Sequence, residues 1–265
     1  MTAARARRAS LPPLPGAASR PGPVDAHAAT GSLLHPMRSD TDRSPLIAQV
    51  WQLPAETALD RDELRRTVDA LTGLQGRLGL TPVRAGHVLT TNQAVTIVIL
   101  IDQPAECADS DDPAAWVSTV LDQKEALRGF ARIARALNAL HAARVVHGAA
   151  AASSLALSEA GLLQLALHRC PGLRSADAAA GGGSPQADAA DLAATIQEVC
   201  SAAEQWLPTP QLEALLQSFR PEPSSPGTTE QEGAARPWNI SLEQLAEELE
   251  DAAALLPSGS GSAQG

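Results

Sequence analysis

The 265-residue sequence is poor in aromatic residues and has almost no lysine. Tyrosine is absent, phenylalanine occurs twice and tryptophan four times, so aromatic residues make up 2% of the chain. A core with this composition must rely on leucine, valine, isoleucine and alanine, and hydrophobic residues reach 44%. Lys124 is the only lysine among 20 basic residues. Chemistry that needs a lysine therefore has a single candidate.

Paired cysteines, long apolar runs and a positive charge balance are also missing. Cys107, Cys170 and Cys200 lie far apart without a Cys-x-x-Cys pair, which argues against structural zinc and for a reducing cytosol. The longest apolar run, 94–101, is far shorter than the roughly 18 residues that span a bilayer. A net charge of −10 excludes the basic surface typical of nucleic-acid binders. We expect a cytoplasmic protein with no membrane span and no nucleic-acid partner.

Both ends of the chain lack an apolar period. Residues 1–43 are rich in alanine, proline, glycine, serine and arginine, and we interpret them as a disordered, solvated arm. Six arginines oppose three aspartates there, so folding of this basic arm onto the acidic remainder is the alternative. Residues 258–265 have the same character and are predicted to form a disordered tail.

A sheet-containing small lobe is predicted at about 44–103. Strands are expected at 46–53, 83–90 and 94–101, and the last is apolar enough to be central in a sheet. A helix is expected between the first two strands. Its buried stripe consists of three residues spaced at helical intervals, Leu64, Val68 and Leu71.

The pattern becomes mainly helical at about 104–257. Helices are expected after Asp112-Pro113, at about 123–142, around Leu192 to Trp206, from Pro210, and after a cap at Ser241. Two short strands, 155–158 and 162–167, form a predicted hairpin, and 172–187 is expected to be a loop. The order of elements predicts one domain at 44–257 with a two-lobed α+β fold.

Four segments resemble parts of a protein kinase and occur in the family's order. Residues 140–148, LHAARVVHG, resemble the approach to the catalytic loop, and 155–166 resemble the two strands that precede the metal-binding motif. Residues 187–194, ADAADLAA, resemble the start of the large buried helix, and Arg236-Pro237 resembles the late Arg-Pro. The chain thus resembles the bacterial serine/threonine kinase type of the protein-kinase-like superfamily, and its alanine and arginine usage is typical of a high-GC genome. The resemblance implies a two-lobed kinase-like fold with a reduced N-terminal sheet lobe.

The groups that phosphoryl transfer needs are missing where the resemblance places them. Kinases use a strand lysine, a helix glutamate, a catalytic-loop aspartate and asparagine, and an aspartate for magnesium. Those positions hold, in the same order, Gln49, Thr67, Ala149, Ser154 and Leu167. The family's histidine is retained as His147, whereas Lys124 lies in the other lobe and cannot replace the strand lysine. The resemblance therefore implies a pseudokinase without catalytic residues or a metal site.

A pseudokinase of this kind is expected to act as a protein-binding or regulatory scaffold with a protein partner, not as an enzyme. Only the hinge-like residues Ile101 and Asp102 remain to pair with adenine, so we expect no cofactor and at most weak, magnesium-independent ATP binding. The alternative is an atypical serine/threonine protein kinase or nucleotide-binding protein. It would use carboxylates that follow this strand, namely Asp102, Glu106, Asp109 and Asp111. A decayed gene product is the third hypothesis.

The two histidines near the predicted catalytic loop, and Cys170, can be interpreted either as reactive groups or as structural residues. His141 and His147 are candidates for a general base or metal ligand, and we favour a structural role for His147 that includes hydrogen bonds to the backbone. Cys170 follows His168-Arg169, a setting that lowers a thiol pKa, but an ordinary cysteine is the interpretation we favour.

Overall fold

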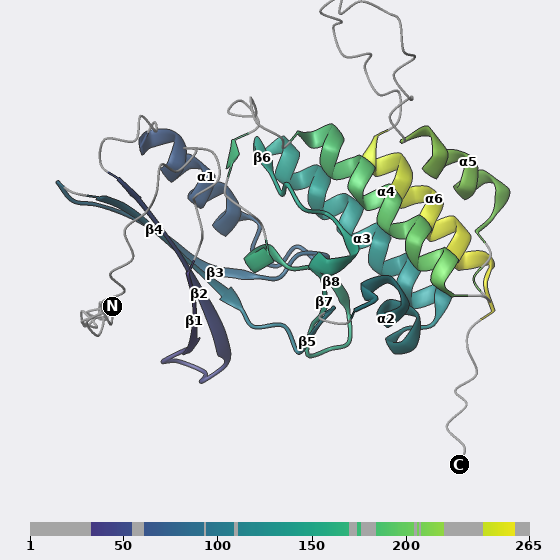
Figure 1. Ribbon diagram of the computed structural model, residues 1–265, viewed down its shortest axis with the longest axis horizontal. Helices are drawn as coiled ribbons and strands as arrows, with labels where there is room; N and C mark the ends of the chain where they lie inside the picture. Colours follow the sequence, from purple (N-terminus) through teal and green to yellow (C-terminus); the bar gives the residue numbers. More distant parts are fainter. Residues whose placement is uncertain are drawn as a thin grey trace, which may run out of the picture.

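The protein has a mixed α+β architecture, with a small antiparallel sheet beside a larger group of helices (Figure 1). The computed structural model describes most of the chain between residues 33 and 257. The described ranges are 33–54, 61–92, 94–108, 111–169, 174–175, 184–203, 206, 208–219 and 241–257. The predicted tail at 258–265, the Arg236-Pro237 pair, Cys170 and Asp109 lie outside them.

The four-stranded sheet has the order β1-β2-β4-β3, and every neighbouring pair is antiparallel. Its strands are β1 (Leu33–Arg38), β2 (Pro45–Pro54), β3 (Val83–Thr90) and β4 (Ala94–Asp102). The three strands expected from the sequence are confirmed, and the bounds of β3 match the prediction. In β4 every second side chain is buried, so one face of the sheet is covered and the other is not.

Helix α1 (Arg61–Gly73) covers one face of this sheet. Its stripe of Leu64, Val68 and Leu71 is buried, as the helical spacing predicts. The contact is close at Gly86 of β3, where an added Cβ would lie 2.3 Å from a methyl group of Val68. Glycine at this position allows α1 to approach the strand.

Strand β1 contradicts the interpretation of residues 1–43 as one disordered arm. Leu33–Arg38 pairs with β2 in a regular antiparallel register, from Leu33 opposite Val50 to Arg38 opposite Pro45. The residues between them form a turn in which the Ser39 N–H donates to the Ser44 carbonyl. The strand lies at the sheet edge, and its residues 34–38 are exposed, so it lacks the alternation of buried and exposed residues that marks a half-buried strand.

The helical part is built around α3 (Gln123–Ala142), whose Phe130, Ile133, Leu137 and Leu140 are fully buried. Helices α2 (Pro113–Val120), α4 (Pro185–Ala202) and α6 (Leu242–Leu255) pack against α3, and α5 (Pro210–Ser218) packs against α4 and α6. The predicted caps at Asp112 and Ser241 are confirmed by hydrogen bonds to the backbone N–H three residues later. These local signals explain why the helix bounds were predictable.

Helix α4 begins within the segment predicted to be a loop. Ser184 caps it and Pro185 is its first residue, so the loop prediction for 172–187 is wrong at 185–187. Arg174–Ser175 forms β9, which pairs with β6 (Val145–Val146), and most of the remaining loop lies outside the described residues. Leu192, Ile196 and Val199 of α4 are fully buried, while Trp206, to which the sequence predicted this helix to extend, is half-buried beyond the helix end at Ala202.

Short elements connect the sheet to the helices. The predicted hairpin is confirmed as β7 (Leu155–Leu157) and β8 (Leu163–Leu165), and β5 (Glu106–Cys107) pairs with β7. The 3-10 helices η1 (Ala152–Ser154) and η2 (Leu167–Arg169) flank this hairpin. Leu165 and Gly79 form a further link, in which the Leu165 N–H donates to the Gly79 carbonyl at 2.8 Å.

Candidate functional site

The candidate site lies where β2 meets the residues after β8. Gln49 of β2 points to the face of the sheet that α1 covers, because its partner Ile99 belongs to the buried row of β4. Its amide Nε2 donates a hydrogen bond of 3.2 Å to the carbonyl of His168 in η2, and Gln49 is 1% exposed. The structure thus joins two positions 119 residues apart that the resemblance assigns to the strand lysine and the metal-binding triplet.

Leu167 makes a second contact, with Thr81 in the segment that precedes β3. Its backbone N–H donates to the hydroxyl of Thr81 at 2.9 Å, and the Thr81 N–H donates to the Leu165 carbonyl at 3.1 Å. Thr81 and Leu167 are both buried. No local sequence pattern indicates a role for Thr81, because its partner lies 86 residues away. At the position assigned to a magnesium ligand, the chain therefore places a buried apolar side chain.

A buried carboxylate holds the loop that follows β6. Asp188 on α4 is fully buried and accepts hydrogen bonds from the backbone N–H groups of His147, at 2.8 Å, and Gly148, at 2.7 Å. Its Oδ2 also lies 2.9 Å from Nε2 of His141 on α3. Thr195, two turns further along α4, donates to the carbonyl of Ala150. Helix α4 thus holds residues 147–150 through two of its side chains.

The surroundings of Asp188 keep it charged and His147 neutral. Burial alone would raise the pKa of Asp188, but the hydrogen bonds from His141 and from two backbone N–H groups outweigh burial and hold it below its usual value. Burial lowers the pKa of His147 to about 4, although Asp188 acts in the opposite direction. The His147 ring is therefore uncharged at neutral pH, and a structural role for His147 fits its 1% exposure.

The pH dependence of stability tests this arrangement. Histidine titrates near 6.5 in the unfolded chain and near 4 in the fold, so the unfolded state binds more protons between these values. Stability contributed by neutral His147 is thus lost as the pH falls. Between pH 7 and pH 4, urea titrations should show a loss about 3 kcal/mol larger for the natural chain than for His147→Gln. Equal losses in both proteins would show that His147 is not buried as a neutral ring.

The other assigned positions are occupied by small or neutral groups. Thr67 is buried on α1, and Ala149 is half-buried after the loop held by Asp188. Ser154 is buried in η1, where its backbone carbonyl accepts from the Ala166 N–H at 2.7 Å. None of these side chains carries a charge. These three positions therefore supply no charged group to a ligand.

The backbone N–H groups of the hinge-like segment, residues 102–105, donate hydrogen bonds to carbonyls of the same chain. The N–H of Asp102 donates to the Pro82 carbonyl at 2.9 Å, and that of Gln103 donates to the Pro45 carbonyl at 3.1 Å. Pro104 has no N–H, and the Ala105 N–H donates to the Leu157 carbonyl at 2.9 Å. Ile101 is 1% exposed within β4. The donors at 102–105 that could pair with adenine are therefore already engaged.

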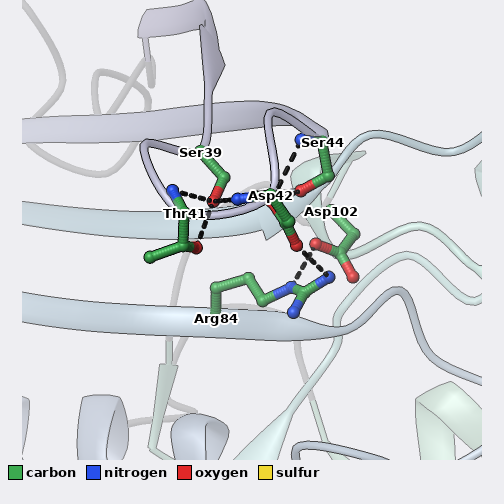
Figure 2. A network of polar contacts seen from close by, with 6 residues as sticks. All are labelled: Ser39, Thr41, Asp42, Ser44, Arg84 and Asp102. Atoms are coloured by element: carbon green, nitrogen blue, oxygen red, sulfur yellow. Dashed lines mark hydrogen bonds and ion pairs between the residues drawn. The ribbon is translucent and has the colours of Figure 1, made fainter.

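The carboxylate of Asp102 belongs to an ion-pair network at the end of the sheet (Figure 2). Nε of Arg84 lies 2.6 Å from Oδ1 of Asp102, and its Nη2 lies 4.0 Å from Oδ2 of Asp42. Hydrogen bonds from Ser39 and Ser44 hold the pKa of Asp42 below its usual value, and Asp102 raises the pKa of Arg84. Among the other proposed carboxylates, Glu106 and Asp111 are exposed. Arg84, which sequence reasoning missed, thus neutralises the carboxylate nearest to the hinge-like segment.

Three further findings concern metal ligation, the buried Cys200 thiol and membrane-spanning helices in the part of the chain that the structure describes. There, no group of three histidine, cysteine or acidic side chains is placed to hold a metal ion. Burial raises the pKa of the Cys200 thiol to about 11, which keeps it protonated. No helix within the described ranges is both long and apolar enough to cross a bilayer.

Comparison with known proteins assigns no family to the chain. No family model matches it, and no curated protein matches its sequence.

Proposed function

We propose that the chain is a catalytically inactive protein-kinase-like domain that acts as a protein-binding or regulatory scaffold. The observation that carries this proposal is the hydrogen bond from the Gln49 amide to the His168 carbonyl. In a kinase, a lysine at the position of Gln49 and an aspartate at the position of Leu167, which directly precedes His168, would hold phosphates and magnesium. Here a neutral amide donates to a backbone carbonyl, so neither of these two groups supplies a charge to a nucleotide.

The contacts between distant segments support the kinase-like part of the proposal. Asp188 links residues 187–194 to residues 140–148, which are two of the four segments that carry the resemblance. The element order supports it as well: strands around α1, then mainly helices with the small β7–β8 hairpin. Sequence similarity between the segments and kinases does not by itself require these contacts, so they are independent support.

The side chains at the catalytic positions lack the atoms that phosphoryl transfer requires, which supports the proposed loss of catalysis. Ala149 has no oxygen or nitrogen in its side chain to accept a proton from a substrate hydroxyl. Leu167 offers no oxygen ligand, which magnesium requires. The net charge of −10 also disfavours the approach of a triphosphate. Because several independent groups are missing, one compensating residue would not restore phosphoryl transfer.

Nucleotide binding and phosphate transfer test the proposal directly. Titration calorimetry with ATP, with and without magnesium, should give no binding in the micromolar range and no effect of the metal. Incubation with radiolabelled ATP and protein substrates should give no labelled product, because no group positions the phosphates or accepts the hydroxyl proton. An active kinase in the same assay is the positive control.

Magnesium-dependent micromolar binding, or labelling that survives stringent purification, would overturn the proposal. The atypical kinase would then be the better account. In that case Asp102→Asn and Glu106→Gln should reduce labelling, whereas Glu198→Gln, an exposed change on α4, should not.

A further inference from the structure

One short hairpin is joined to three strands of the sheet. It consists of β7 and β8 together with the 3-10 helix η2 that follows them, and we call this unit, residues 155–169, the central hairpin. Figure 1 shows β7 and β8 between the sheet and the helices. Strands β4, β3 and β2 each reach the central hairpin by a different route. A movement of the sheet against the helices would therefore have to change its contacts.

Strand β4 is joined through the chain itself. It continues past Asp102 into β5, whose Glu106 lies opposite Leu157 of β7. The N–H of Ala105 adds a hydrogen bond of 2.9 Å to the Leu157 carbonyl. A connection of a few residues is the usual place for a hinge, so this link alone would leave the sheet able to rotate about it.

Strand β3 is joined through the residues that precede it. Leu80 forms a parallel bridge with Leu165 of β8, and Leu165 makes backbone hydrogen bonds with both Gly79 and Thr81. The hydroxyl of Thr81 also accepts from the Leu167 N–H at 2.9 Å. All five residues are buried, so water can replace these hydrogen bonds only after the structure opens.

Strand β2 is joined through a side chain. The amide of Gln49 donates to the His168 carbonyl of η2 at 3.2 Å, and Gln49 is buried. Because β4 lies between β2 and β3 in the sheet, the links of β2 and β3 start from strands that are roughly 10 Å apart. Two links at separate points, added to the connection of β4, oppose rotation of the sheet about any one of them.

We propose that the central hairpin fixes the sheet in one orientation against the helical part, so that the chain offers a protein partner one preformed surface. A hinged opening would break the hydrogen bonds of Leu165 and Leu167 and expose both buried residues. The preformed surface rests on the proposed scaffold function. The fixed orientation does not, because it is independent of whether the chain binds a nucleotide or a protein.

Amide hydrogen exchange of the full chain, followed by NMR, tests the fixed orientation. The N–H groups of Thr81, Leu165 and Leu167 join the two parts, whereas those of Ile133 and Leu137 lie within α3. The joining amides should exchange only through global unfolding, at rates within about tenfold of the α3 amides after correction for intrinsic exchange. Faster exchange of the joining amides would show that the sheet opens separately from the helices and would overturn the proposal.

A double variant tests the two side-chain links. Gln49→Met with Thr81→Val removes both, and exchange at Leu165, whose own backbone hydrogen bonds remain, should become about tenfold or more faster relative to α3. The ratio to α3 corrects for a loss of global stability. Gln52→Met with Thr90→Val makes the same changes at exposed sites on β2 and β3 and should leave the ratio unchanged. An unchanged ratio in the first variant would overturn the assignment of these side chains as links.

Discussion

Replacing Asp188 with alanine is expected to lower the free energy of unfolding by about 3–5 kcal/mol, because removal of one member of a buried charged network leaves the others unpaired. The carboxylate is fully buried and accepts from the N–H groups of His147 and Gly148 while it contacts the His141 ring. Alanine leaves these donors without their acceptor, and the N–H of His147 is buried, so water replaces the lost hydrogen bonds incompletely. Denaturant titration measures the loss, and amide exchange at His147 and Gly148 should accelerate.

Glu198 provides the control on the same helix. It lies about three turns beyond Asp188 with an exposed side chain, and Glu198→Ala should change stability by less than about 0.5 kcal/mol. Similar small losses at both positions would show that α4 does not hold the 147–148 loop. Because the contact at Asp188 is also the link between two segments of the kinase resemblance, that result would weaken the proposed function as well.

Helices and central strands were predictable because their signals are local. Asp112-Pro113 and Ser241 mark helix starts through side-chain bonds to a nearby N–H, and the structure contains both bonds. The apolar residues of β4 alternate between a buried and a half-buried row, which requires no knowledge of distant partners. Such elements are determined by neighbours within a few residues, and a sequence pattern contains those neighbours.

The missed elements lacked these local signals or had them masked by composition. Strand β1 contains Pro36, and its residues 34–38 are all exposed, so neither propensity nor alternation marks it. Its strand character comes from pairing with β2. The start of α4 did carry a signal, because Ser184-Pro185 is a cap followed by proline, but the glycine-rich context favoured a loop.

The candidate site could be predicted only as a set of positions. The resemblance placed Gln49 and residues 167–169 at related positions, and the structure adds that the Gln49 amide reaches the His168 carbonyl. The roles of Thr81 and Arg84 were not accessible, because their partners lie 86 and 18 residues away and no pattern relates them. Side-chain pairing across such separations depends on the folded geometry.

Substituting Gly79 with alanine should lower the free energy of unfolding by about 2–5 kcal/mol, through backbone strain together with overpacking. Gly79 has a φ of +104°, a conformation that residues with a Cβ rarely adopt. An added Cβ would lie 2.3 Å from the carbonyl oxygen of Arg132 and 2.8 Å from the Ile133 nitrogen, both backbone atoms of buried α3. Movement of Gly79 would also disturb the bond from the Leu165 N–H to its carbonyl, which joins the sheet side to β8.

Gly76→Ala separates the two contributions to this loss. Gly76 has a similar φ of +85°, but an added Cβ would meet nothing within 4 Å. Its substitution should therefore cost only the backbone strain, about 1–3 kcal/mol. A denaturant titration of both variants should show the larger loss for Gly79→Ala, and the difference measures the close approach of the 79–81 segment to α3. Equal stability losses in the two variants would mean that α3 moves away from the added Cβ without a measurable free-energy cost. The 79–81 segment would then not hold the sheet in place against the helical part.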